Sequence, residues 1–92
     1  MEGKTLNQFI DDLHYNAETE FTLKGTRYII SGWSNDNGTY TLSLCTIEKN
    51  SSELFNCTAT TRDEVVETFE NAKIFGDKTI YEVEKDIMVM YG

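Results

Sequence analysis

The fold of this protein is decided by residues 20–47, which read EFTLKGTRYIISGWSNDNGTYTLSLCTI. Within this stretch apolar and polar side chains alternate, a pattern typical of β-strands that bury one face. Turn-forming residues interrupt the alternation at Gly25-Thr26 and across residues 34–38. The pattern predicts antiparallel strands that begin at Glu20 and cover residues 27–33 and 39–47, and a fourth strand follows over 53–58.

The two turns also predict how the strands pair. If residue 24 pairs with residue 27, Phe21 lies opposite Ile30. If the second turn centres on Asp36, Ile30 lies opposite Leu42. A slip of one residue would exchange the two faces of a strand. The agreement between both hairpins therefore supports the predicted assignment of side chains to the core face and the open face. The predicted core face carries Phe21, Leu23, Tyr28, Ile30, Tyr40, Leu42 and Leu44, and the predicted open face carries Thr22, Ile29, Ser31, Trp33, Thr41, Ser43 and Cys45.

Three capping boxes predict helices on either side of the strands. A capping box is a Ser or Thr followed three residues later by Glu or Gln, and it occurs at Thr5, Thr61 and Thr79. The first two boxes precede apolar residues at helical spacing, which predicts amphipathic helices. We expect the first helix to end near Asn16. The second has Val65, Val66, Phe69 and Ala72 on its apolar side, and a break follows at Gly76-Asp77.

The segment that begins at Thr79 fits two structures. Ile80, Val83 and Ile87 have helical spacing, whereas Tyr81, Val83 and Ile87 also fit an alternating strand. The capping box favours a helix, with residues 88–91 as its last turn or as a short extra strand. For residues 1–92 we therefore predict a single α+β domain, a four-stranded antiparallel meander with one N-terminal helix and two C-terminal helices packed on one face.

Composition excludes several classes of function. The 92 residues contain no proline, 16 acidic side chains and eight basic ones, for a net charge of -8. This charge disfavours direct binding to nucleic acid or to an anionic membrane, because both select Lys and Arg. The N-terminus lacks the features of a signal peptide, and no apolar run reaches the roughly 18 residues of a membrane span. We expect a cytoplasmic protein.

No residue pattern predicts an enzyme, a metal site or a cofactor. His14 is the only histidine, and near a helix end it can serve as a favourable charge. Cys45 and Cys57 would lie opposite each other if the last hairpin centred on Ser51. That geometry would allow a disulfide or, with His14, thiol chemistry, and the alternative is two reduced thiols beside the core.

Acidic residues collect outside the predicted strands. Residues 1–20 carry a net charge of -4, residues 62–92 carry -4, and residues 21–61 carry zero. Carboxylates three or four residues apart on a helix project about 5–6 Å apart, near the roughly 6–7 Å between successive phosphates of a nucleic acid. The acids therefore either imitate a row of phosphates or form a solvated surface. The candidate partner-binding acids are Glu64, Glu67, Glu70, Glu82 and Asp86.

Trp33 is the other candidate contact residue. The predicted register places it on the open face of the sheet, where an exposed tryptophan could anchor a partner. It could instead pack under a loop or against Phe55. The alternative function is a sheet-mediated interaction module or homodimer that uses Trp33, Ile29 and Phe55. In that case the acidic side chains only form a solvated surface.

The chain as a whole resembles a group of small inhibitors. It is very short, proline-free and acidic, with a small predicted sheet and acidic helices. In these features it looks like inhibitors encoded by phages and mobile elements, anti-CRISPR proteins among them. The likeness implies a non-catalytic protein that occupies a basic groove of a protein partner, such as a CRISPR effector nuclease, and it transfers no functional residue. The segment 75–83 is also similar to a closing helix of uncharacterised small phage and bacterial proteins.

Overall fold

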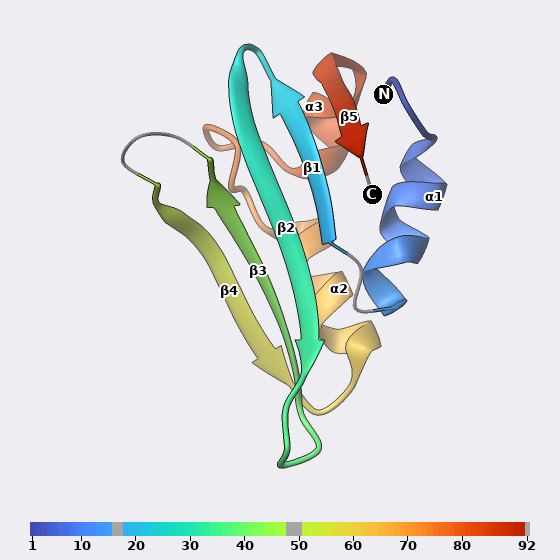
Figure 1. Ribbon diagram of the computed structural model, residues 1–92, viewed down its shortest axis with the longest axis vertical. Helices are drawn as coiled ribbons and strands as arrows, with labels where there is room; N and C mark the ends of the chain where they lie inside the picture. The colour runs from blue at the N-terminus through green and yellow to red at the C-terminus, as the bar shows by residue number, and fades with distance from the viewer. Residues whose placement is uncertain (16–17, 48–50, 92) are drawn as a thin grey trace.

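The computed structural model describes residues 1–15, 18–47 and 51–91, which form a five-stranded antiparallel sheet with helices on one face (Figure 1). The strands lie in the order β4-β3-β2-β1-β5. The elements are α1 (Leu6–Asp12), the 3-10 turn η1 (Leu13–Tyr15), β1 (Glu18–Leu23), β2 (Thr26–Ser34), β3 (Tyr40–Thr46), β4 (Glu53–Ala59), α2 (Arg62–Asn71), α3 (Ile80–Val83), η2 (Glu84–Asp86) and β5 (Ile87–Tyr91). The α+β class is therefore as predicted, and the number of strands is not.

The fifth strand replaces the last part of the predicted C-terminal helix. α3 has only four residues, and after η2 the chain extends so that Ile87 pairs with Leu23 and Val89 pairs with Phe21. This pairing satisfies backbone groups of β1 that would otherwise form an unpaired sheet edge. The outer edge of β5 is covered in turn, because the Glu2 N–H donates to the Ile87 carbonyl at 2.9 Å. Of the two structures left open for residues 88–91, the strand is the one observed.

The predicted register is wrong by two residues in both central hairpins. Phe21 lies opposite Tyr28, not Ile30, because the first turn is formed by Lys24 and Gly25 instead of Gly25-Thr26. Both turn residues have positive φ, 50° and 85°, as a type I′ turn requires. In the second hairpin Ile30 lies opposite Leu44. A shift of two residues leaves every side chain on its original face, so the predicted faces are confirmed.

The core lies between the sheet and the helices. Phe9 of α1 contacts Phe21 of β1 edge-to-face at 5.7 Å, and Phe69 of α2 contacts Phe55 of β4 at 5.7 Å. Tyr28 and Tyr40, the two tyrosines of the predicted core face, are half-buried and pack against the core. The buried apolar residues are Phe9, Leu13, Phe21, Leu23, Ile30, Leu42, Leu44, Val65, Val66, Phe69, Phe75, Ile80, Val83 and Ile87.

The two cysteines lie on opposite faces of the sheet, which corrects the predicted pairing. Cys57 lies opposite Leu42 and packs against the core, whereas Cys45 lies opposite Glu53. A β-bulge between Leu44 and Cys45 breaks the regular pairing of β3 with β4. Both thiols are free, and a disulfide between them is excluded because the sheet separates their side chains.

The capping boxes predicted the helix starts. The Thr5 hydroxyl accepts a hydrogen bond from the Gln8 N–H at 3.1 Å, and the Thr61 hydroxyl accepts one from the Glu64 N–H at 3.2 Å. α1 ends at Asp12 and η1 continues to Tyr15, so the predicted cap at Asn16 lies outside the described residues. None of the helices in the described part of the chain is long and apolar enough to cross a bilayer.

Candidate functional site

Acidic side chains dominate the layer of helices that covers the sheet. We call residues 1–15 and 62–86 the helical layer; it carries eleven acidic and five basic side chains, a net charge of -6. The rest of the chain carries the remaining charge of -2. Glu18 and Glu20, which were counted above with the first helix, belong to β1, so their charge lies in the sheet. The excess negative charge is therefore on the helical side of the molecule.

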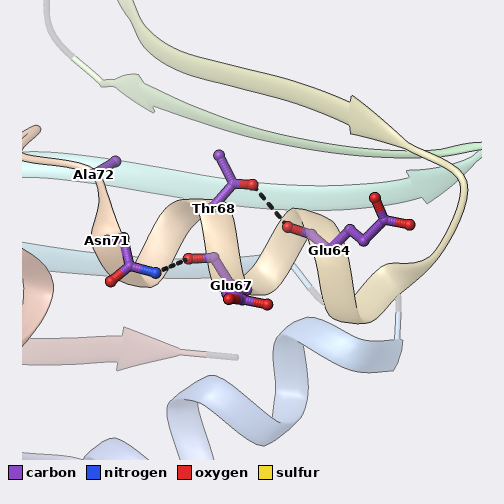
Figure 2. A pocket seen from close by; sticks show the side chains of 5 residues that line it. All are labelled: Glu64, Glu67, Thr68, Asn71 and Ala72. Carbon is purple, nitrogen blue, oxygen red and sulfur yellow. Dashed lines mark hydrogen bonds between the residues drawn. The ribbon is translucent and has the colours of Figure 1, made fainter.

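The outer face of α2 is the most regular part of this acidic surface. Val65, Val66 and Phe69 of α2 are buried against the sheet. Glu64 and Glu67 point the other way and line a shallow hollow of about 570 Å³ along the helix, together with Thr68, Asn71 and Ala72 (Figure 2). The packing of one face of α2 thus fixes the direction of the carboxylates on the other.

Polar neighbours in the hollow bond to the helix backbone and not to the carboxylates. The Thr68 hydroxyl donates to the Glu64 carbonyl at 2.8 Å, and the Asn71 amide donates to the Glu67 carbonyl at 2.9 Å (Figure 2). These bonds satisfy the two polar side chains locally. Thr68 and Asn71 therefore leave the carboxylates of Glu64 and Glu67 unoccupied.

Three of the five candidate acids accept hydrogen bonds within the protein. Glu64 accepts from the Thr60 and Thr61 hydroxyls at 2.9 and 3.2 Å. Glu82 accepts from the Thr79 N–H at 3.1 Å, and Glu70 accepts from the Tyr81 hydroxyl. In the part of the chain that the structure describes, the exposed carboxylates of Glu67 and Asp86 accept no hydrogen bond. Glu67 and Asp86 are accordingly the acids with the most freedom to meet a partner.

The bond between Tyr81 and Glu70 joins α3 to the C-terminal part of α2. Hydrogen bonding to Glu70, with smaller effects from burial and from the negative charge of Glu70, raises the pKa of Tyr81 from 10.0 to about 12. The phenol therefore stays protonated and donating throughout the physiological range. This contact places the acids of α2 and α3 on neighbouring, connected elements.

His14 is held by two contacts at the junction of η1 and α2. Its Nδ1 lies 3.2 Å from the Ile10 carbonyl oxygen, and its Nε2 lies 3.2 Å from an Asp63 carboxylate oxygen. Cys57, the proposed thiol partner of His14, packs instead against the core from β4. No hydrogen bond joins His14 to Cys57 in the structure. Among the described residues, no group of three or more His, Cys, Asp or Glu side chains could hold a metal ion.

Trp33 lies on the open face of the sheet, as predicted, with 43% of its surface exposed. Phe55 lies on the opposite face, against Phe69, so both roles predicted for Phe55 beside Trp33 are wrong. Leu54, also 43% exposed, is the apolar residue that β4 presents instead, but it lies near Cys45 while Trp33 lies opposite Thr41. The two apolar side chains are therefore at different ends of a polar surface.

Hydrogen-bonded polar side chains fill the open face between these two residues. The Thr41 hydroxyl bonds to the Thr58 hydroxyl at 2.8 Å and accepts from the Asn35 amide at 2.9 Å. The Ser43 hydroxyl donates to Glu53 at 2.9 Å. Thr41 and Ser43 are buried even though no helix covers them. The middle of the face is thus a satisfied polar ladder, with Trp33 at one end and Ile29, Cys45 and Leu54 close together at the other. The ladder divides the apolar surface, unlike the continuous apolar patch typical of a sheet-mediated dimer.

Sequence reasoning missed two features that the fold assembles from distant residues. Arg62 donates to the His14 carbonyl and lies over the Tyr40 ring, and Lys24 and Lys78 line the same second pocket. No local pattern connects residues so far apart in the chain. Only two glycines of positive φ, Gly25 next to Lys24 and Gly76 two residues before Lys78, mark these positions as tight turns.

The fold and this surface define a small α+β protein whose distinguishing feature is an acidic helical layer. No known protein-family model matches the chain, and no curated protein and no solved structure matches it either. The function is therefore inferred from the surface itself.

Proposed function

We propose that this protein is a non-enzymatic acidic binding protein that inhibits a nucleic-acid-handling protein by occupying its basic groove. The net charge of -6 on the helical layer is the observation that carries this proposal. The resemblance to anti-CRISPR inhibitors supplies the target class, a CRISPR effector nuclease. Such a target presents rows of Lys and Arg to nucleic-acid phosphates, and a compact set of carboxylates competes for the same cations.

The carboxylates of α2 are suited to this competition by their spacing and rigidity. Glu64 and Glu67 are three residues apart on one helix, so their side chains project about 5–6 Å apart, close to a phosphate repeat. The helix is anchored by Val65 and Phe69 in the core. An anchored helix loses little conformational entropy on binding, which favours affinity. The one-sided charge also speeds encounter with a basic surface.

Charge reversal on the helical layer tests the proposal. Glu67→Lys with Asp86→Lys changes the two acids that make no hydrogen bond within the described residues, so the fold is retained. The matched control is Glu18→Lys with Asp36→Lys, which changes the net charge equally but on the sheet side. Each variant is assayed for inhibition of DNA cleavage by a panel of purified CRISPR effector nucleases and for displacement of labelled DNA from them.

The proposal requires inhibition by the native protein that weakens steeply as salt rises. It also requires the helical-layer variant to lose inhibition while the control variant keeps it. If the control variant loses as much, net charge alone is responsible and no groove-binding surface exists on the helices. If no nuclease of the panel is inhibited, the assigned target class is wrong.

The second candidate is an interaction module that binds through the open sheet face. Its supporting observation is the exposed indole of Trp33. Trp33→Ala separates the two functions, because the acidic-groove model expects it to leave inhibition unchanged. Loss of binding in Trp33→Ala, with salt-independent binding by the native protein, would favour the sheet face.

A further inference from the structure

A second pocket, of about 370 Å³, lies where the β1–β2 hairpin meets the loop between α2 and α3. In Figure 1 this loop is the orange segment that passes behind β2. The apolar part of the pocket is formed by Leu23, Tyr28, Phe75 and Val83. The Tyr28 and Phe75 rings meet edge-to-face at 5.7 Å, so the pocket has an aromatic wall.

Two lysines, Lys24 and Lys78, are among the residues that line this pocket, and each lies in or next to a tight turn. Lys24 is itself in the type I′ turn with Gly25. Lys78 follows Gly76 and Asp77, which have positive φ of 63° and 66°, and its carbonyl accepts a hydrogen bond from the Phe75 N–H at 3.0 Å. Positive φ confines both turns to a narrow range of conformations. The backbone at both lysines is therefore fixed.

No carboxylate of the described residues neutralises the charge of these lysines. Among the described residues, no carboxylate lies within salt-bridge distance of Lys24 or Lys78, although the chain has twice as many acids as bases. By contrast, Lys4 pairs with Asp12 at 2.6 Å. Asp77 is exposed in the turn and does not line the pocket. A pocket that has an aromatic wall and is lined by two lysines has a positive local field in an acidic molecule.

We infer that this pocket binds a small amphipathic carboxylate with an aromatic or aliphatic body. The body would lie against Tyr28 and Phe75, and the carboxylate would lie between the ammonium groups of Lys24 and Lys78. The volume is near the lower end of the roughly 300–1,000 Å³ typical of small-molecule sites, which fits a two-ring acid. The Thr26 side chain also lines the pocket and offers a hydroxyl donor. This site is separate from the acidic surface and does not depend on the proposed inhibitory function.

Titration with 1-naphthoate tests the inference, with 1-naphthalenemethanol as the uncharged control probe. Backbone amide shifts in two-dimensional NMR locate the binding, and their concentration dependence gives the affinity. We expect naphthoate to shift the amides of Leu23, Tyr28 and Phe75, and the alcohol to bind at least about tenfold more weakly because it forms no charge-assisted hydrogen bonds.

A pair of lysine variants completes the test. Lys24→Gln with Lys78→Gln removes the charges of the two pocket lysines, and Lys73→Gln with Lys85→Gln removes two exposed lysines that do not line the pocket. We expect the pocket variant to weaken naphthoate binding at least about tenfold and the control variant less than about twofold. Absent shifts at the pocket, equal binding of the alcohol, or equal loss in both variants would overturn the inference. All four positions are exposed, so the variants fold.

Discussion

The guanidinium carbon of Arg62 lies 5.0 Å from the centre of the Tyr40 ring, so the first residue of α2 stacks on the first residue of β3. The same guanidinium donates to the His14 carbonyl and, at 3.2 Å, to the Ser34 hydroxyl. One side chain therefore joins η1, the end of β2 and the start of α2. This position needs the flat fork of arginine, since a lysine ammonium cannot stack and reach both acceptors together.

Replacing Arg62 by Lys is expected to lower the free energy of unfolding by about 1–3 kcal/mol. The His14 carbonyl or the Ser34 hydroxyl would lose its hydrogen bond from residue 62, and the ring contact with Tyr40 would weaken. Urea denaturation followed by circular dichroism measures the change. Lys73→Arg, an exchange of the same two side chains at an exposed position, should leave stability within about 0.5 kcal/mol. Equal stability of Arg62→Lys and the native protein would contradict the bridging role.

Leu42→Ala is expected to destabilise the fold by about 2–5 kcal/mol, because Leu42 is 1% exposed and its removal leaves a cavity. Leu54→Ala is the matched control on the neighbouring strand β4. Its side chain is 43% exposed on the open face, so the expected change is below about 1 kcal/mol. Thermal and urea unfolding measure both variants. Similar losses for the two would show that the core and open faces of the sheet are misassigned.

Glu70→Gln is expected to lower the pKa of Tyr81 from about 12 toward the ordinary 10.0 of tyrosine. The variant removes both the strong acceptor and the negative charge that hold the phenol protonated. Titration of tyrosinate absorbance at alkaline pH should show one tyrosine ionising earlier. Glu67→Gln makes the same charge change on the same helix without touching Tyr81, and its titration should match that of the native protein.

The raised pKa of Tyr81 also sets the pH range over which its contact stabilises the fold. Because the folded-state pKa is above the unfolded value, the contribution is complete below about pH 10 and is lost as the pH rises through about 12. The difference in stability between the native protein and Glu70→Gln should therefore be constant at neutral pH and shrink in strong alkali. A difference that grows with alkali would have the wrong sign for this contact.

Mild oxidation is expected to leave Cys45 and Cys57 unlinked within one molecule, because they lie on opposite faces of the sheet. Alkylation of the unfolded protein after oxidation, followed by mass spectrometry, should find two reactive thiols in the monomer. Replacement of both cysteines by Ser provides a second readout, since the acidic-groove model expects full inhibition from a folded variant. A monomer that has lost two hydrogens and cannot be alkylated would disprove the separation of the thiols.

Side-chain faces and helix starts could be read from the sequence because both depend on neighbouring residues. Alternation of polar and apolar side chains assigns a face whatever the partner strand does, so Phe21 and Leu42 were placed in the core despite a register wrong by two. The hydroxyls of Thr5 and Thr61 bond to backbone only three residues away. These features follow from local covalent geometry.

Tertiary structure alone decided the features that join distant parts of the chain. Ile87 and Val89 have a pattern compatible with helix or strand, and the open edge of β1 selects the strand. The bulge beside Cys45, the stack of Arg62 on Tyr40 and the pocket shared by Lys24 and Lys78 likewise have no local signature. The acidic character of the helical layer was readable from composition, but the freedom of its individual carboxylates was not. Backbone hydrogen bonds and contacts between remote residues form only once the sheet closes, and their energy depends on partners that no short window of sequence contains.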